Sequence, residues 1–341
     1  MTRRRVTLTD VAERAGLSVT AASLVLNRQP GTRLSEEAHH RVLAAAEELG
    51  YRPNIAARSL RTQKTATLAF VSDVVATTRF AGGMIRGALD AAREHGHVLL
   101  IAETQGDKDV ERQAIEAMID RQVDGFVYAA MATRRLTVPV AVLTRTAVLL
   151  NATSTDRLVS VLPADEDAAC KAAIALLDAG HRKIALIGRN TVKERDPEQS
   201  LAAGLRLRGV RRALAGRRLR LVAAGHTEDW QPDHGYDVAR ELLRQPRRPT
   251  GIVCMNDRLA FGTYQAIAEA GLAVPDDISV VSFDDDPIAS WLRPGLTTAA
   301  LPHEPMGRLA VELLLAGPGA PGKRMVPMPL VVRSSVAAPR G

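Results

Sequence analysis

The segment Val6–Ser18 restricts the possible folds of this chain more than any other stretch. Thr7 is followed three residues later by Asp10, a spacing that is typical of a capping box at a helix start. An apolar face at helical spacing comes next, made of Leu8, Val11, Ala12 and Ala15. The segment therefore predicts a short amphipathic helix.

A second short helix is predicted directly after a tight turn. Gly16 can adopt the positive φ that ends the first helix, and Ser18 can cap the next one. The second helix is expected over Val19–Leu26, and Asn27 suits its end. Two short helices joined by a glycine turn are a helix-turn-helix candidate, which predicts DNA as a partner.

Positive charge is concentrated in the same part of the chain. Residues 1–64 contain eleven Lys and Arg against six Asp and Glu, while the whole chain has a formal net charge of +7. This asymmetry favours a nucleic-acid-binding module joined to a nearly neutral domain. A solvated basic tail is the alternative, and the capped helices favour the folded module.

A third helix and a short hinge segment follow. Ser35–Leu49 predicts a helix, because a serine cap is followed by two acidic residues and an apolar stripe. Tyr51-Arg52-Pro53 is expected to be extended, because the residue before a proline avoids the α region. Asn54 can then cap a short helix, Ile55–Leu60, and the polar stretch Arg61–Thr65 is expected to be a linker.

From Thr67 onwards, short apolar runs alternate with amphipathic helical stretches. The predicted strands are Thr67–Val71, Val98–Ala102, Gly125–Ala129, Val138–Leu143, Lys183–Ile187, Leu219–Ala223, Gly251–Met255 and Ile278–Phe283. The predicted helices are Gly83–His95, Asp109–Arg121, Asp165–Ala179, Leu201–Ala215, Asp233–Leu243, Asp257–Ala270 and Pro305–Ala316. Such alternation is typical of parallel sheets covered on both faces. Two sets predict two α/β lobes, with a ligand in the cleft at the carboxyl ends of the strands.

Several other classes of protein are disfavoured by the sequence. Cys170 and Cys254 lie far apart without metal-ligand or redox spacing, which fits a reducing cytoplasm. No apolar run approaches the roughly 18 residues of a membrane span, so we expect no membrane partner. His95 and His97 have no third ligand nearby, so we expect no metal. The glycines near Gly83 lack a dinucleotide-binding fingerprint, and no catalytic array is recognisable, so we expect neither a cofactor nor an enzyme.

The combined motifs resemble the family of the lactose and purine repressors, bacterial regulators that bind an operator as dimers and sense a small molecule. In the head the resemblance rests on the stretch from Thr7 to Ser18, on Tyr51-Arg52-Pro53-Asn54 and on Ala56-Ala57-Arg58-Ser59-Leu60. Further along, it rests on Leu177–Ala185, Asn256-Asp257, Ile278–Asp285 and Leu296-Thr297-Thr298. Each motif is weak alone, but their order is highly specific and covers essentially the whole chain.

The resemblance implies an N-terminal all-α helix-turn-helix head and an α/β core of two doubly wound parallel-sheet lobes, like those of periplasmic binding proteins. We expect the head over residues 1–53 and a hinge helix with a linker over residues 54–65. The first lobe is expected over residues 66–162 and about 297–322, and the second over residues 163–296 and about 323–341.

The resemblance also implies which head residues contact operator DNA. The second helix would lie in the major groove, with Val19, Thr20 and Leu24 as the base-reading positions. Leu24 could instead be packed on the first helix. The residues implied to hold the phosphate backbone are Thr7, Ser18, Ser23, Asn27 and Tyr51.

The hinge helix is implied to form only when two copies pair on DNA, because it is too short to be stable alone. Leu60 matches the residue that wedges between base pairs in the minor groove, and Ala57 leaves room for the partner helix. Asn54 opens this segment. A plain linker is the alternative.

An effector cleft between the lobes is implied as well. The residues assigned to it by resemblance are Asp73, Phe80, Arg206, Trp230, Asn256, Asp257 and Asp284. Carboxylates, an amide, a guanidinium and a flat aromatic face suit a sugar better than an apolar ligand. Asp257 could instead be only a helix cap, and the run that begins at Asp284 could be a solvated loop.

The chain also departs from the family pattern. The first lobe usually has an Asp-Arg pair after its fourth strand, whereas this chain has Thr144-Arg145, followed by an unusual loop predicted over Ala147–Arg157. The arginine-rich stretch Arg206–Arg220 could be a second nucleic-acid patch, although a solvated helix face is the simpler interpretation.

The function that follows from the resemblance is a dimeric, ligand-responsive repressor, released from a pseudo-palindromic operator by a small sugar. A purine-like corepressor that promotes DNA binding is the nearest alternative. A sugar-binding transport protein and a sugar-metabolising enzyme are more distant ones. No apolar heptad tail follows Val331-Val332-Arg333, so we do not expect a tetramer built through a C-terminal coiled coil.

Overall fold

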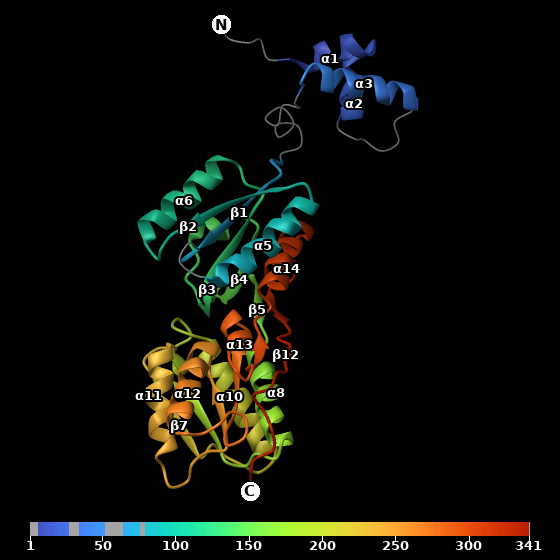
Figure 1. Cartoon of the computed structure of the whole chain (residues 1–341). Coiled ribbons are helices and arrows are strands. Elements are labelled where there is room, and N and C mark those ends of the chain that lie inside the picture. Colours follow the sequence, from blue (N-terminus) through green and yellow to red (C-terminus); the bar gives the residue numbers. More distant parts are fainter. Residues whose placement is uncertain (1–5, 27–33, 52–63, 76–78, 341) are drawn as a thin grey trace. The chain divides into compact units, whose positions relative to one another are not determined.

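The computed structural model describes residues 6–26, 34–51, 64–75 and 79–340 (Figure 1). The chain separates into two units, Met1–Thr65 and Ala66–Gly341, which we call the head and the core unit.

The head contains three helices: α1 (Leu8–Ala15), α2 (Val19–Leu26) and α3 (Glu36–Glu48). The capping box predicted at Thr7 is confirmed, because Asp10 N donates to Thr7 Oγ1 at 3.3 Å and Thr7 N donates to Asp10 Oδ2 at 2.7 Å. Gly16 ends α1 with a φ of 66°, as its place in the turn predicts. The helix-turn-helix order is therefore present as local sequence signals indicate.

A small apolar core holds the three helices of the head together. It contains the buried residues Val11, Ala12, Ala15, Ala22, Val25, Val42, Ala45 and Ala46. An ion pair at 2.8 Å between Arg14 on α1 and Glu48 on α3 lies at the rim of this core. Its side chains are more than half exposed, so we attribute head stability mainly to the apolar contacts.

The core unit contains two six-stranded sheets. The first sheet has the order β11-β5-β4-β3-β1-β2, and all its pairings are parallel. Its strands are β1 (Thr67–Ser72), β2 (Val98–Glu103), β3 (Gly125–Arg135), β4 (Ala147–Thr153), β5 (Val159–Pro163) and β11 (Gly322–Val326). Leu68 and Phe70 face one apolar cluster, and Ala69 and Val71 face another, so this sheet is buried on both faces.

The second sheet has the order β12-β10-β9-β8-β6-β7. It is parallel except for its edge strand β12, which pairs antiparallel with β10. Its strands are β6 (Ile184–Arg189), β7 (Ala223–His226), β8 (Gly251–Cys254), β9 (Ser279–Asp284), β10 (Thr297–Ala300) and β12 (Leu330–Val331). The two parallel sheets confirm the predicted fold class.

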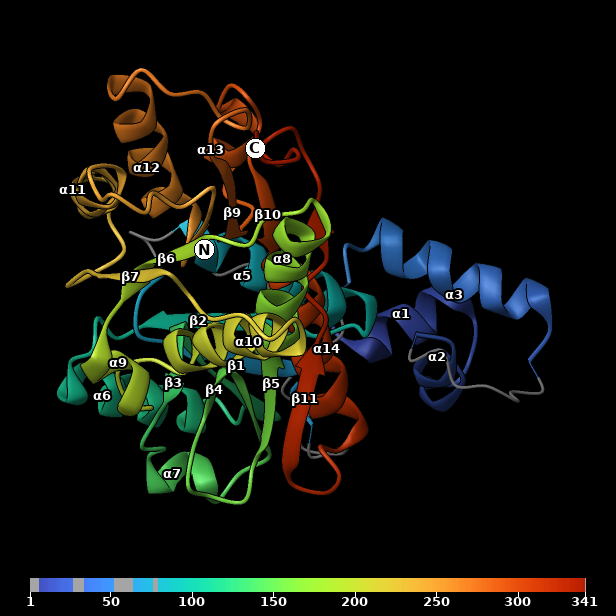
Figure 2. The same ribbon diagram turned by 90° about the horizontal axis from the view of Figure 1, so that it is seen from below.

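Helices cover both faces of each sheet. The first lobe has α5 (Arg79–Glu94) and α14 (His303–Ala316) side by side on one face, with α6 (Lys108–Asp120) and the short α7 (Val140–Leu143) on the other (Figures 1 and 2). The second lobe has α8 (Asp165–Asp178), α9 (Thr191–Arg195), α10 (Ala202–Gly216), α11 (Pro232–Leu243), α12 (Asp257–Glu269) and α13 (Pro287–Trp291). Two of its helix pairs, α8 with α10 and α11 with α12, pack closely.

Glycines allow these helix pairs to approach each other closely. A Cβ atom placed on Gly262 of α12 would lie 1.7 Å from the carbonyl oxygen of Pro232 on α11. A Cβ atom placed on Gly307 of α14 would lie 1.9 Å from the carbonyl oxygen of Met84 on α5. Only a residue without a side chain fits at such contacts.

Within residues 79–340, the chain passes between the two sheets three times: after β5, after β10 and after β11. The last two crossings lie a few residues later than the domain boundaries expected from the sequence. Thr297–Ala300 pairs with β9 in the second sheet, and Gly322–Val326 pairs with β5 in the first. Because strand pairing is a long-range choice, the local pattern could not place these crossings.

Two sequence predictions in the first lobe are wrong. Val138–Leu143 was predicted to be a strand, but Pro139 begins the short helix α7 there. The fourth strand is instead the fully buried β4, which lies inside the segment predicted to be a loop. Thr144-Arg145 therefore precedes the fourth strand and does not follow it. In the second lobe, β7 lies a few residues later than the predicted strand Leu219–Ala223.

Candidate functional site

A cavity of about 390 Å³ lies where both lobes contribute the carboxyl ends of their strands. The first sheet and the crossing to α14 line it with Met131, Ala132, Thr133, Asn151, Leu301 and His303. The second lobe lines it with Lys193, Gln199, Ser200, Ala202, Arg206, Trp230, Asn256 and Asp284. The structure thus brings Arg206, Trp230, Asn256 and Asp284 together, four of the residues assigned to an effector cleft.

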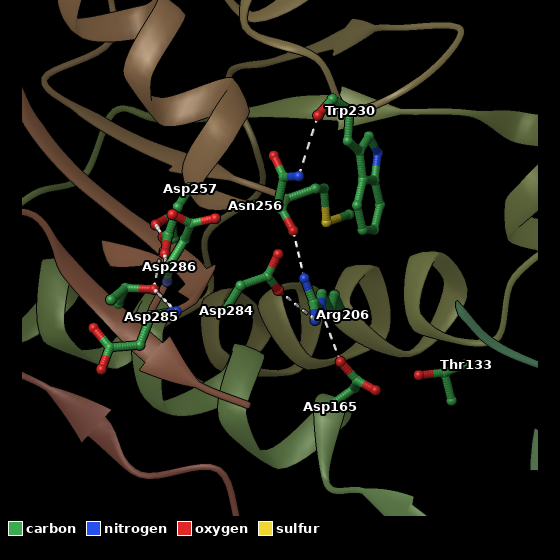
Figure 3. A network of polar contacts seen from close by, with 12 residues as sticks. Thr133, Asp165, Arg206, Trp230, Asn256, Asp257, Asp284, Asp285 and Asp286 are labelled. Atoms are coloured by element: carbon green, nitrogen blue, oxygen red, sulfur yellow. Dashed lines mark hydrogen bonds and ion pairs between the residues drawn. The ribbon is translucent and has the colours of Figure 1, made fainter. Parts of the chain in front are cut away.

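Arg206 on α10 is held by three polar partners (Figure 3). Its Nε donates to Asp165 Oδ1 at 2.7 Å, and its Nη1 donates to the carbonyl oxygen of Met255 at 2.6 Å. Its Nη2 lies 3.2 Å from Asp284 Oδ1. The side chain is only 3% exposed, so its position is fixed before any ligand arrives. A buried charge with this many partners is an oriented hydrogen-bond donor.

Two aromatic rings enclose the same guanidinium. Its central carbon lies 5.5 Å from the ring centre of Trp230 and 4.6 Å from that of Phe283. Trp230 Nε1 donates to the carbonyl oxygen of Gly188 at 2.9 Å, which fixes the indole. Burial alone would lower the pKa of Arg206, but Asp165 and Asp284 raise it overall, so the group stays charged.

Asp284 ends β9 with a φ of 110°, and its side chain lines the cavity. Burial raises its pKa to about 6, although the charge of Arg206 acts in the opposite direction. His303, from the start of α14, has a pKa lowered by burial to about 4 and is therefore neutral near pH 7. Asp165 is fully buried, and its Oδ2 has no hydrogen-bond partner among the described residues.

Asn256 and Asp257 have different roles although they are neighbours. Asn256 is the cap of α12: its Oδ1 accepts from Leu259 N at 2.9 Å, and its Nδ2 donates to the carbonyl oxygen of Trp230 at 3.1 Å. Asp257 is therefore not the helix cap that one interpretation of the sequence suggested.

Asp257 lies behind the cavity and is not among the residues that line it. It accepts hydrogen bonds from Ser282, from Thr298 Oγ1 at 2.7 Å and from Asp286 N at 2.8 Å. Burial, which is the largest effect, raises its pKa. We interpret it as a support for the loop that follows Asp284.

Asn151 and Thr133 are cavity residues that sequence reasoning missed. Thr133 Oγ1 donates to Asn151 Oδ1 at 2.7 Å, and Asn151 Nδ2 donates to the carbonyl oxygens of Ala130 at 2.9 Å and Met131 at 3.1 Å. Asn151 has a φ of 55°, a conformation that asparagine tolerates better than most residues. Its place near the carboxyl end of β4 could have revealed it, had the fourth strand been predicted correctly.

Asp73, the first-lobe carboxylate assigned to the effector cleft, lies elsewhere. It pairs with Arg134 at 2.9 Å, accepts from Met131 N at 3.0 Å and lines a separate polar cavity of about 320 Å³. Phe80 belongs to α5, but its side chain is outside the described part of the structure. The described first-lobe residues that line the cavity are therefore ones that the sequence did not assign to it, and the assignment of Phe80 stays a prediction.

In the head, the base-reading candidates on α2 lie outside the apolar core. Val19 is 42% exposed, and Thr20 is exposed as well. Leu24 is half-buried and is not part of the head core, whereas its neighbour Val25 is. The structure thus gives no support to the alternative that Leu24 is packed on the first helix.

Some of the residues assigned to the DNA backbone belong to the described part of the head, and the others do not. Thr7 Oγ1 forms the capping box, Ser18 Oγ accepts from Ala21 N at 3.2 Å, and Tyr51 packs against the head core. Ser23 is half-buried on α2. The other predicted contacts, including the hinge, lie outside the described residues: Asn27, Asn54, Ala57 and Leu60.

Two kinds of feature are absent from the described residues. No group of three or more His, Cys, Asp or Glu side chains in them could hold a metal ion. None of their helices is long and apolar enough to cross a membrane.

Known proteins resemble this chain along most of its length. Residues 7–54 match the bacterial regulatory proteins of the lacI family, and residues 173–336 match the periplasmic binding protein-like domain. The ribose operon repressor of Escherichia coli (strain K12) is 32% identical over 319 residues, covering 91% of this chain and 92% of the relative. The sucrose operon repressor of Escherichia coli is 32% identical over 338 residues, covering 96% and 99%.

Among solved structures, the lac repressor dimer bound to operator and the anti-inducer ONPF superposes with a TM-score of 0.77. It is 26% identical, and the match covers 98% of this chain and 100% of that one. Together with the helix-turn-helix head and the two-lobed core, these matches show that the chain belongs to the lacI family of DNA-binding bacterial transcription regulators, and that it is not an enzyme.

Proposed function

We propose that this protein is a repressor that a small sugar releases from its operator. The single observation that carries the effector assignment is the guanidinium of Arg206, held between two carboxylates and facing a cavity of about 390 Å³. A volume of this size is within the range of small-molecule sites. The curated relatives named as ribose and sucrose operon repressors support a sugar as the ligand class.

The polar groups of the cavity are complementary to neighbouring hydroxyl groups of one ring. Arg206 has N–H groups beyond those used by Asp165, Met255 and Asp284, so it can donate to sugar oxygens. Asp284 can accept from a sugar hydroxyl when it is ionised, and the indole of Trp230 offers a flat apolar face to the ring. We propose Asn256 as a further contact.

On the DNA side, we propose that α2 enters the major groove of a pseudo-palindromic operator in a homodimer. Val19, Thr20 and Leu24 would meet base edges, since they lie on the part of α2 outside the head core. Thr7, Ser18, Ser23, Asn27 and Tyr51 are proposed to contact the phosphate backbone. The segment with Asn54, Ala57 and Leu60 is proposed to enter the minor groove.

Effector binding would act by shifting a population of core conformations. Within the described residues, the lobes are joined by three chain crossings and by backbone hydrogen bonds, among them Arg135 N to the carbonyl of Pro197 and Leu201 N to the carbonyl of Thr133, each 2.7 Å. A sugar that bridges both lobes would stabilise the closed arrangement. The paired hinge segments would then separate, and operator affinity would fall. Because the operator is in the cytoplasm, we place the protein there.

The test combines a ligand screen with an operator-binding assay. A thermal-shift screen against sugars and purines should identify a stabilising sugar, since a ligand at a hundred times its Kd adds about 2.7 kcal/mol. That sugar should weaken operator binding in a gel-shift assay, and Asp284→Ala should lose the response while binding DNA normally. A purine that tightens operator binding would favour the corepressor alternative, and a retained sugar response in Asp284→Ala would refute the assigned site.

Binding by the head can be tested separately. Affinity for the operator should fall on the order of a thousandfold over a few-fold rise in salt if six or more phosphates are contacted. Leu60→Ala should reduce operator bending measured by gel shift. A flat salt response would contradict DNA binding through the head, and unchanged bending would contradict the hinge assignment.

A further inference from the structure

A groove of about 660 Å³ on the second lobe is lined by four arginines. They come from three neighbouring segments: Arg189 ends β6, Arg211 belongs to α10, and Arg218 and Arg220 lie in the connection from α10 to β7. Between them the lining is apolar, with Leu214, Leu219, Leu221 and small residues of β7. None of the described residues that line this arginine groove is acidic.

The arginines on and just after α10 form two groups, those with a carboxylate partner and those without one. The neighbouring arginines on and just after this helix are paired: Arg208 with Glu166 at 3.2 Å, Arg212 with Asp167 at 2.6 Å, and Arg217 with Asp178 at 2.7 Å. In the part of the chain that the structure describes, no carboxylate pairs with Arg211, Arg218 or Arg220. The paired arginines contact carboxylates of α8, whereas no acidic residue lines the groove within the described residues.

Arg189 is the member of the groove that does have a carboxylate partner. It forms a two-point pair with Glu194 on α9, in which Nη2 lies 2.8 Å from Oε2. This pair is largely buried, so the guanidinium of Arg189 is held in place at the end of β6. The groove thus combines one fixed guanidinium with three that have no carboxylate partner.

Arg218 occupies a backbone position that disfavours it. Its φ is 59°, directly after the end of α10, where Leu219 N donates to the carbonyl oxygen of Leu214 at 2.9 Å. Glycine is the residue that usually fills this left-handed position after a helix. An arginine there strains the backbone, and its side chain lines the groove.

We propose that the arginine groove is a binding site for a small metabolite that carries more than one phosphate group. Guanidinium groups bind phosphate oxygens through two parallel N–H donors, and several of them together match a multiply charged anion. The hollow has the volume of a small-molecule site, whereas a duplex would need an extended basic surface. This groove is separate from the sugar cavity, because no described residue lines both of them. Within the described residues, Arg206 is the one arginine of the second lobe that lines the sugar cavity.

The proposal can be tested on the full chain with inorganic tripolyphosphate as the probe in isothermal titration calorimetry at low salt. Arg218→Gly removes the side chain and suits the local φ, so the melting temperature should stay the same or rise. Its affinity for tripolyphosphate should nevertheless fall tenfold or more. Arg247→Ala, an exposed arginine between α11 and β8, removes the same charge outside the groove and should change the affinity less than twofold.

Three results would overturn the proposal. Equal tripolyphosphate affinities of the wild type, Arg218→Gly and Arg247→Ala would show that binding is elsewhere on the chain. Citrate binding as tightly as tripolyphosphate would show that the groove does not recognise phosphoryl groups. Arg218→Gly could also lose affinity for a duplex without operator sequence, to the same extent as for tripolyphosphate. That result would identify the groove as a nucleic-acid surface instead.

Discussion

Asp165 and Arg206 form a fully buried ion pair in which Arg206 Nε donates to Asp165 Oδ1 at 2.7 Å. Asp165 is the first residue of α8, two residues after β5 ends, so it lies at the first chain crossing between the sheets. Arg206 lines the proposed effector cavity from α10. The pair therefore links the group that would hold the ligand to a segment that would have to adjust if the lobes moved.

We expect Asp165→Asn to weaken sugar binding by about tenfold or more, because a charge-assisted hydrogen bond contributes roughly 1.5–3 kcal/mol. Operator affinity without sugar should stay near the wild-type value. Calorimetry with the sugar and a gel shift without it measure the two effects. Asp178→Asn, which breaks the exposed pair with Arg217, is the control and should leave both unchanged. A wild-type sugar affinity in Asp165→Asn would contradict the positioning role.

Sugar affinity should depend on pH through Asp284. Its pKa is raised to about 6 by burial, so it is ionised at pH 7 and becomes protonated as the pH falls through that value. A protonated carboxyl loses its attraction to Arg206 and one acceptor site for the sugar. The affinity should therefore fall by up to tenfold per pH unit below about 6, as titrations between pH 7.5 and pH 5 can measure.

The neighbours of Asp284 make this prediction more specific. The charges of Asp165 and Asp286 raise its pKa, and Arg206 lowers it, while His303 stays neutral down to a pH of about 4. Asp165→Asn should move the midpoint of the affinity loss to a lower pH, because one negative charge is removed. Identical midpoints in the two proteins, or a flat profile in the wild type, would contradict the assignment of Asp284.

Gly262→Ala should destabilise the second lobe severely. The new Cβ atom would lie 1.7 Å from the carbonyl oxygen of Pro232, a backbone atom that cannot move away without separating α11 from α12. Overpacking of this kind costs about 1–3 kcal/mol or more, and chemical denaturation followed by circular dichroism can measure it. Gly82→Ala on α5, where no atom lies within 4 Å, should be neutral or slightly stabilising. Equal stabilities of the two variants would show that the helices can separate freely.

Leu24→Ala and Val25→Ala are expected to separate DNA reading from head folding. Val25 is 3% exposed in the head core, so its truncation should lower the stability of the head by about 1–3 kcal/mol. Leu24 is outside that core, so its truncation should leave the head stable but change the preferred operator sequence in a binding-site selection. An unchanged preference would mean that Leu24 does not contact bases.

The head could be predicted almost to the residue because its signals are local. The Thr7 capping box and the Gly16 turn involve partners within a few positions, and α2 has the predicted bounds. Strand order and chain crossings depend on partners far away in sequence, so the local pattern predicts a loop where β4 lies and a lobe boundary at about residue 297, which is before β10 and not after it. Short apolar runs such as Val138–Leu143 are ambiguous between strand and helix.

The candidate site, too, could be predicted from the sequence only in part. Arg206, Trp230, Asn256 and Asp284 line one cavity, as the resemblance to the lactose and purine repressors implied. Asn151 was missed because its strand was missed, and Asp73 was assigned to the cavity although Arg134 engages it elsewhere. Which of these residues bind a ligand stays a prediction.

Because of the three chain crossings, the head and the lobes differ in how they could be exchanged between related proteins. Each lobe is assembled from separate stretches of sequence, so a truncation between α8 and α14 would remove elements from both lobes together. The head is one continuous stretch that ends before β1 begins. The head can therefore be exchanged between related proteins as one segment of sequence, whereas neither lobe of the core unit can be exchanged without the other.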